Sequence, residues 1–222
     1  MKHILVIAPH ADDETLGCGG ALLRHRAEGC NVHWLLITGM TTKAGFNSEQ
    51  ILKRQEEIAL AVTQYDFETV HQLNFPPAAL ETLPIGKVIS GIANVVNLIK
   101  PDTVYVPYRN DAHSDHEVVF DAAMSATKSF RYPFIKRILA YETISETDFG
   151  MKPEDGGFRP NVYLDITPYL NKKLDILDVF ESEVGEFPFP RSRKALEALA
   201  ALRGVQSNCN AAEAFMLLKE IL

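Results

Sequence analysis

The chain has 222 residues, a net charge of −7 and an isoelectric point near 5.5. This length is sufficient for one well-buried core, so we expect a single domain over residues 1–222. The acidic balance argues against nucleic acid or an anionic membrane as partner, because both require a basic surface. There is no apolar run of the ~18 residues that a membrane span requires, and the start does not resemble a secretion signal. We therefore expect a cytoplasmic protein without a transmembrane segment.

The first 142 residues alternate between short apolar runs and helical patterns. The runs predict strands at 3–8, 31–38, 68–73, 103–106 and 137–142, and the patterns predict helices at 15–28, 47–63, 85–100 and 114–128. Asn47 and Gln50 form a capping pair at the start of the second helix. This rhythm predicts an α/β protein with a Rossmann-like three-layer fold, in which helices cover both faces of a mainly parallel sheet.

The pattern changes after residue 142. Residues 147–160 are rich in glycine, proline and charge and are expected to form a mobile loop. We then expect a strand at 161–166 and helices at 169–182, 191–203 and 211–222. Three scattered cysteines rule out a disulfide framework and are expected to be small buried apolar residues: Cys18, Cys30 and Cys209.

Two short motifs carry residues capable of chemistry. His10-Ala11-Asp12-Asp13-Glu14 directly follows the first predicted strand, and His113-Ser114-Asp115-His116 begins the fourth predicted helix, where Ser114 and Glu117 fit a capping box. Each motif alone has an ordinary structural explanation, since Asp residues cap helices. Together they bring three histidines and several carboxylates to the carboxyl ends of parallel strands, where ligands bind in such sheets. A cluster of His and Asp suits zinc, iron or manganese.

At this point the sequence resembles the PIG-L/LmbE-like family of zinc-dependent N-deacetylases. The resemblance rests on APHADDETLGCGG at residues 8–20 and HSDH at 113–116. Four later stretches also resemble family features: YETISET at 141–147, YLDIT at 163–167, PRS at 190–192 and AEAF at 213–216. Ala11 departs from the family, which commonly has proline there. So does the Asp111-Ala112 pair before His113, where many members have glycine.

The resemblance implies residue roles. It makes His10, Asp13 and His116 the zinc ligands, Asp12 the general base and His113 the group that stabilises the oxyanion. Asp115 would then orient His113. These roles agree with general chemistry, because a zinc ion with three protein ligands and an open position activates water for amide hydrolysis.

Some further residues remain open between two interpretations. Arg54 resembles a family arginine near the substrate, but its charged neighbours also fit a solvated helical face. Asn110 and Asp111 also have two interpretations. They bind substrate at the mouth of the pocket together with Arg54, or they only shape the loop. Glu14 is expected to be structural. The glycines of residues 17–20 are expected to allow close helix packing rather than dinucleotide binding, because the GxGxxG spacing is absent.

The expected function is zinc-dependent removal of an N-acetyl group from an N-acetylglucosamine-type amino sugar or its conjugate. Fe²⁺ or Mn²⁺ could replace Zn²⁺, because a His₂Asp site accepts all three. One alternative is a metal amidase with a different acyl group or a thiol-conjugate substrate. Another is a metal- or sugar-binding module without turnover. The partner is a small-molecule amino sugar, and the sequence leaves a homo-oligomer open.

Overall fold

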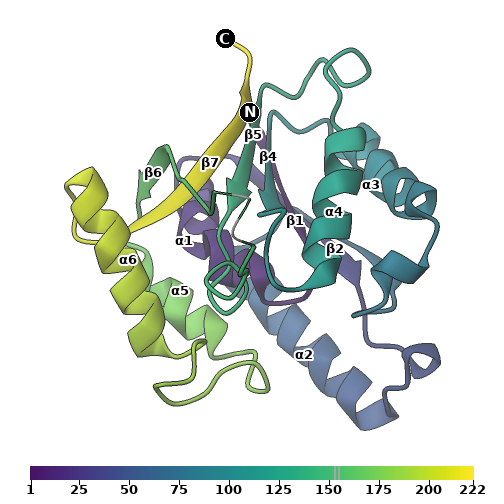
Figure 1. The fold of residues 1–222 in the computed structure, drawn as a ribbon, viewed down its shortest axis with the longest axis horizontal. Helices are drawn as coiled ribbons and strands as arrows, with labels where there is room; N and C mark the ends of the chain where they lie inside the picture. The colour runs from purple at the N-terminus through teal and green to yellow at the C-terminus, as the bar shows by residue number, and fades with distance from the viewer. Residues whose placement is uncertain (153, 155) are drawn as a thin grey trace.

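A seven-stranded sheet forms the middle of the molecule (Figure 1). The computed structural model describes residues 1–152, 154 and 156–222. The strand order is β3-β2-β1-β4-β5-β7-β6. Five strands run parallel, and they are β1 (His3–Ala8), β2 (Asn31–Thr38), β3 (Thr69–Phe75), β4 (Thr103–Pro107) and β5 (Arg137–Tyr141). The last strand, β7 (Ala212–Glu220), pairs antiparallel with both β5 and β6 (Val162–Asp165).

Helices cover both faces of this sheet, which confirms the predicted fold class. The core on one face includes side chains of α1 (Asp13–Ala27), α2 (Ser48–Tyr65) and α5 (Leu170–Leu177). The core on the other face includes side chains of α3 (Ile85–Ile99) and α4 (Ser114–Ser125). Beyond β6 lies α6 (Arg193–Ser207), and two short 3₁₀ helices span Thr42–Ala44 and Leu80–Thr82. Figure 1 shows α3 and α4 on the right of the sheet and α5 and α6 on the left.

The first strand shows why its sequence is a continuous apolar run. Alternate side chains of a strand point to opposite faces of the sheet. Ile4 and Val6 enter one core, whereas Leu5 and Ile7 enter the other. Because helices cover both faces of the sheet, every residue of β1 after His3 is buried. An apolar residue is therefore favoured at each of these positions.

The C-terminal segment corrects one prediction. Residues 211–222 were expected to form a helix, but Ala212–Glu220 is the strand β7. Alanine, glutamate, leucine, methionine and lysine all favour helices in isolation. Here the open edge of β5 accepts the segment as an antiparallel partner, and β6 pairs with its other side. Tertiary pairing therefore overrides local propensity.

Other differences are local. The helix expected at 169–182 ends at Leu177, and turns follow it. His113, not Ser114, is the N-cap of α4, because its imidazole accepts the backbone N–H of Asp115. The Asn47–Gln50 capping box is present. Cys18 and Cys30 are buried as expected, whereas Cys209 is half-buried.

Two positions of the expected mobile loop at 147–160, residues 153 and 155, lie outside the described residues. The described part of that segment contains turns and irregular backbone but neither helix nor strand. Among the described residues, no helix is both long enough and apolar enough to cross a membrane.

Candidate active site

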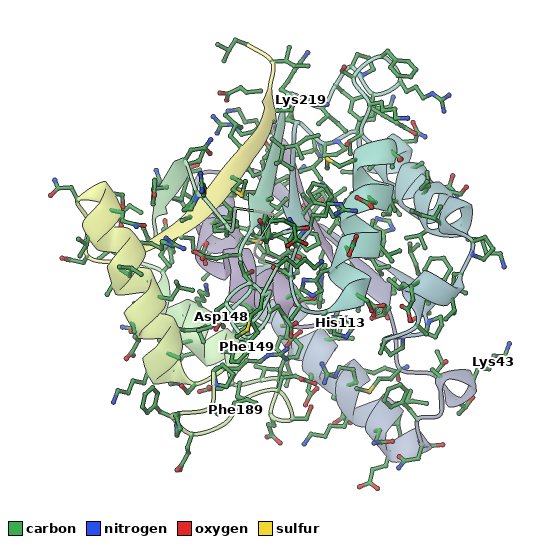
Figure 2. All side chains as sticks on the ribbon, viewed as in Figure 1. Lys43, His113, Asp148, Phe149, Phe189 and Lys219 are labelled. Carbon is green, nitrogen blue, oxygen red and sulfur yellow. The ribbon has the colours of Figure 1, made fainter. Side chains whose placement is uncertain are left out.

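The topology brings the two motifs together. β1 and β4 are neighbours in the sheet, so the turn after Ala8 and the loop after Pro107 meet at one edge. The imidazole centroid of His10 lies 4.5 Å from that of His113 and 5.6 Å from that of His116. In Figure 2, His113 lies at the lower end of the sheet, opposite Lys219 near the end of β7. The expected convergence at the carboxyl ends of the strands is therefore observed.

The turn that carries the first motif has an unusual backbone. Asp12 has a φ of 144°, a conformation that costs a non-glycine residue on the order of 1–3 kcal/mol. Its N–H donates to the carboxylate of Glu14 at 3.1 Å. The preceding carbonyl, that of Ala11, accepts a hydrogen bond from Arg54 at 2.8 Å. These contacts thus hold Asp12 in a backbone conformation that is otherwise unfavourable. Glu14 contributes to them through its hydrogen bond, in agreement with the structural role expected for it.

The glycines of α1 pack as predicted. A Cβ on Gly17 would lie 2.2 Å from the ring of Tyr141, and one on Gly20 would lie 2.6 Å from Ile166. Cys18 is non-helical, with φ of −144° and ψ of 19°, so α1 is kinked there. The buried carboxylate of Glu213 on β7 accepts the N–H groups of Gly20 at 2.8 Å and Ala21 at 2.7 Å. Glu213 thereby satisfies donors just beyond the kink.

His10, Asp13 and His116 form a compact group that could hold a metal ion. The Asp13 carboxylate lies 3.3 Å from Nδ1 of His10 and 3.3 Å from Nε2 of His116. The other nitrogen of each ring faces a carboxylate outside the group. His10 Nε2 lies 2.9 Å from Asp115, and His116 Nδ1 lies 2.7 Å from Asp111. Carboxylates placed behind histidines in this way orient metal ligands in many proteins.

One buried atom tests whether the group fits a metal ion. Nε2 of His116 is buried and has no hydrogen-bond partner among the described residues. Buried polar atoms rarely remain unsatisfied, and a cation beside Asp13 would satisfy this one. Two imidazoles and one carboxylate also match the donors that zinc prefers. The residues therefore fit a divalent metal.

A second combination, His10 with His113 and Asp115, also places its ligand atoms close together. Its carboxylate is more fully engaged, however, because Asp13 accepts one backbone N–H, that of His10 at 2.8 Å, whereas Asp115 accepts two. The side chain of Asp115 accepts the backbone N–H groups of Ala78 at 2.7 Å and Leu80 at 3.1 Å, besides its contact with His10. The first combination thus fits a metal better.

The electrostatics of the first combination also favour a cation. Burial lowers the pKa of His116, but the carboxylates of Asp13 and Asp111 outweigh it and raise that pKa to about 10. Burial likewise lowers the pKa of His10, and Asp115 and Asp13 raise it to about 9. Burial would raise the pKa of Asp13, yet His116 and His10 hold it well below its usual range. The site therefore stabilises positive charge deep in the protein.

A cavity of about 320 Å³ opens beside this group. His10, Asp12 and His113 line it, whereas Asp13 and His116 lie behind them and do not. Burial and the neighbouring Asp13 raise the pKa of Asp12 to about 7, although Arg191 opposes this shift. A carboxylate of this pKa, facing a cavity, is suited to accept and return a proton near neutral pH.

The side chain of His113 is placed differently from the expectation. Asp115 was expected to orient His113 through its carboxylate, but Nδ1 of His113 lies 4.0 Å from that carboxylate, too far for a hydrogen bond. The reason is that the carboxylate turns toward His10, Ala78 and Leu80. Nδ1 of His113 instead accepts the backbone N–H of Asp115 at 3.1 Å. We assign the ring proton to Nε2 on this hydrogen bond.

The predicted substrate-binding residues are mostly engaged elsewhere. Arg54 lines the cavity, but it is buried and also contacts Ala11, Glu57, Ser182 and Glu183. Asp111 is 1% exposed and is directed at His116 and Thr147, so it lies behind the candidate ligands instead of in the cavity. Asn110 is half-buried, accepts from Arg109 at 3.4 Å and is not among the lining residues.

Sequence reasoning assigned no role to Arg191 and Glu183, which complete the cavity wall. Arg191 donates to the Asp12 carboxylate at 2.8 Å and to Glu183 at 3.0 Å. Glu183 also contacts Arg54, so an alternating chain of charges runs from α2 to Asp12. The PRS stretch at 190–192 was the available signal for Arg191. Glu183 offered none, because it lies in an irregular segment.

Comparison with known proteins agrees with this geometry. Residues 5–127 match the family model PIG-L, described as GlcNAc-PI de-N-acetylase. The chain belongs to the PIG-L family. A PIG-L relative, the uncharacterized deacetylase YaiS of Escherichia coli (strain K12), is 32% identical over 149 residues, which cover 65% of this chain and 75% of YaiS. The recognition made from the two motifs is confirmed, and the family relatives are deacetylases.

A second PIG-L relative spans nearly the whole chain. The diacetylchitobiose deacetylase of Thermococcus kodakarensis is 26% identical over 229 aligned residues, covering 96% of this chain and 82% of that enzyme. Among solved structures, the conserved protein TT1542 from Thermus thermophilus superposes with a TM-score of 0.79 at 24% identity, covering 100% of this chain and 97% of TT1542. That superposition shows a shared fold.

Proposed function

We propose that this protein is a metal-dependent hydrolase that removes the acetyl group from an N-acetylglucosamine-type amino sugar or its conjugate. One observation carries the proposal: the side chains suited to proton transfer, Asp12 and His113, face the cavity, whereas Asp13 and His116 lie behind them beside His10. Family membership supports the reaction type, and the name of the Thermococcus relative supports an acetylated amino sugar.

His10, Asp13 and His116 would hold the metal, which we take to be zinc, although iron or manganese would suit the same ligands. When bound, such an ion polarises a carbonyl group and makes water more acidic. Asp111 and Asp115 keep the two imidazoles oriented through Nδ1 of His116 and Nε2 of His10. The protein supplies this arrangement before any substrate arrives, so little reorganisation is needed during the reaction.

Asp12 acts as the base in this proposal. Its carboxylate takes a proton from the attacking water, and Arg191 at 2.8 Å keeps it pointed into the cavity. His113 acts as the donor. Burial and the neighbouring His10 lower the pKa of His113, so its ring stays neutral and presents the Nε2 proton to the developing oxyanion. The departing amine then regains a proton from Asp12.

The experiment is amine release from N-acetylglucosamine, diacetylchitobiose and a nucleotide-linked N-acetylglucosamine. Protein stripped with a chelator is compared with the same protein after addition of Zn²⁺, Fe²⁺ or Mn²⁺. We expect release only with metal. Asp12→Asn should lower turnover by about 10²–10⁴-fold while the bound metal stays in place. Metal-independent release, or none from any substrate, would overturn the proposal.

A further inference from the structure

The YETISET stretch at 141–147 runs from the last residue of β5 into the turn that follows it. Parallel strands place such turns at the carboxyl edge of the sheet, where the two motifs also meet. In Figure 2, Asp148, the next residue along the chain, lies at the same lower end of the sheet as His113. The stretch therefore lies beside the candidate site.

The hydroxyl of Thr147, the last residue of the stretch, has a defined hydrogen-bond direction. The backbone N–H of Thr143 donates to its Oγ1 at 2.8 Å. The single hydroxyl proton is donated to Oδ1 of the buried Asp111 side chain at 2.6 Å, because an ionised carboxylate can only accept. One oxygen of Asp111 is thus held by Thr147, and the other, Oδ2, lies 2.7 Å from Nδ1 of His116.

This chain of hydrogen bonds determines which nitrogen of His116 is available to a metal ion. An imidazole that binds a metal through one nitrogen keeps its proton on the other. Asp111 accepts that proton at Nδ1, which leaves for the ion Nε2, the buried nitrogen without a hydrogen-bond partner among the described residues. A carboxylate held at both oxygens keeps its orientation, so the contact from Thr147 also limits the movement of the His116 ring.

The backbone around this pair of side chains is fixed as well. The N–H of Ala112, in the loop after β4, donates to the carbonyl of Glu146 at 3.0 Å. A Cβ on Gly150 would lie 2.3 Å from the carbonyl oxygen of Asn110, so the turn and the loop approach each other closely. The backbone therefore sets the distance between the two side chains independently of the hydrogen bond that joins them.

Arg191 fixes the other side of the turn. Its guanidinium donates to Oγ of Ser145 at 2.8 Å and to the Glu146 carboxylate at 3.2 Å. Ser145 has a φ of 79°, a conformation that a non-glycine residue keeps only where surrounding contacts hold it. Because Arg191 also donates to Asp12, the same turn supports the candidate base and, through Thr147, a candidate ligand.

We infer that Thr147 is a positioning residue of the candidate metal site and holds the Asp111 carboxylate so that His116 presents Nε2 to the ion. This inference rests on the metal site of the proposed function and adds to it a residue that neither binds the metal nor lines the cavity. Without the hydroxyl, Oδ1 of Asp111 would lose its hydrogen bond while it stays buried, which is unfavourable. The carboxylate would then be free to turn, and the imidazole would lose its fixed orientation.

Two substitutions remove the hydroxyl. Thr147→Val keeps the shape of the side chain, and Thr147→Ala removes the hydroxyl without adding a methyl group. Each should lower the affinity for Zn²⁺ about 10–100-fold, as measured by competition with a chromogenic chelator. Thr147→Ser keeps the hydroxyl and should keep most of the affinity. Thr127→Val is the matched control and should bind Zn²⁺ like wild type, because Thr127 is buried beyond the far end of α4 and its hydroxyl donates to the carbonyl of Ala123.

A double variant separates positioning through Asp111 from a general structural effect. In Asp111→Asn combined with Thr147→Val, the affinity for Zn²⁺ should fall little further than in Asp111→Asn alone, because both changes act on the same contact with His116. Losses that multiply would show that Thr147 acts independently of Asp111 and would overturn the inference.

The outcomes also separate this inference from the proposed function. Unchanged Zn²⁺ affinity in Thr147→Val and Thr147→Ala, with metal-dependent amine release by the wild-type protein, would overturn the inference and leave the proposed function standing. An equal loss in Thr147→Ser would also overturn the inference, since the hydroxyl would then not be the cause. Failure of the wild-type protein to bind Zn²⁺, Fe²⁺ or Mn²⁺ would overturn both.

Discussion

The two ends of the parallel sheet each gather histidines, but in opposite electrostatic surroundings. At the carboxyl end, carboxylates raise the pKa values of His10 and His116 to about 9 and 10. At the amino end, burial lowers the pKa values of His25 and His33 to about 4. The amino-end rings bond to neutral groups: His25 to the hydroxyl of Tyr105, and His33 to Thr69 and to the ring of His3.

This contrast shows what distinguishes the histidines of the candidate site from histidines with a structural role. Both ends contain partly buried imidazoles that lie close together, and at the amino end these are the rings of His3 and His33, whose centroids are 5.3 Å apart. The carboxyl end adds buried carboxylates, which favour positive charge there and would orient the rings toward a metal ion. At the amino end the carboxylate that faces a ring is the half-exposed one of Glu28, 3.9 Å from His25, and burial outweighs it, so the rings stay neutral. His33 links β2 to β1 and β3, and His25 links α1 to β4.

The largest expected difference between the two ends is in metal binding. His116→Ala removes a buried candidate ligand and should abolish both bound metal and turnover, a loss greater than the roughly 10–100-fold typical of groups behind the ligands. His33→Ala at the amino end is the matched control and should keep its metal. The check is metal content per chain after gel filtration, and equal content in the two variants would contradict the distinction.

The next effect concerns the charges that hold Asp12. Arg191→Lys keeps the charge but cannot contact Asp12, Glu183 and Glu146 together. A hydrogen bond between charged groups is worth roughly 1.5–3 kcal/mol, so kcat should fall about 10–100-fold, with KM changing less. Arg193→Lys, whose exposed arginine pairs with Asp175 and Asp178, is the control. A rise in KM alone would show instead that Arg191 binds substrate.

An effect of similar size is expected on metal affinity when the carboxylate that contacts His116 is changed. Asp111→Asn retains the shape of the side chain but weakens the contact with Nδ1 of His116. Metal affinity should fall about 10–100-fold, as measured by competition with a chromogenic chelator. Asp121→Asn, at a half-buried partner of Arg109 away from the candidate ligands, should leave the affinity unchanged. Unchanged affinity in Asp111→Asn would mean that this carboxylate does not support the site.

The smallest effect on activity is expected at the amino end, where the change appears in stability. The pKa of His33 is about 4 in the native protein, lowered by burial and by His3 and His71, and about 6.5 in an unfolded chain. Between these values the unfolded state binds more protons, so stability falls as pH drops from 6.5 toward 4. His33→Gln cannot titrate, so its unfolding free energies, measured by urea titration at pH 7.5 and 4.5, should differ less than those of wild type, by on the order of 2 kcal/mol. Equal differences would refute a neutral His33.

Much of the fold and of the candidate site could be read from local sequence. The run from His3 to Ala8 predicts a strand buried on both faces, and the structure has it. His10, Asp13, His113 and His116 lie in two short motifs, and each motif directly follows or precedes a regular element. Local signals of this kind are sufficient because parallel strands bring their carboxyl ends to a common edge.

The remaining features depend on contacts between distant parts of the chain. β7 could not be predicted because its residues favour a helix until β5 and β6 pair with it. Asp111 could be placed near the site but not assigned to His116, since that depends on how the loop after β4 turns. Arg191 contacts Asp12 from an irregular segment, so no periodic sequence pattern predicts this contact.

The bond between Glu213 and the kinked helix α1 sets an order of events during synthesis. His10, Asp13 and His116 are synthesised before β7. The Glu213 carboxylate, which accepts the N–H groups of Gly20 and Ala21, is synthesised only with that last strand. Arg191, the partner of Asp12, is also made after all three candidate ligands. A growing chain can therefore contain all three candidate metal ligands while the turn that positions them still lacks its supporting contacts.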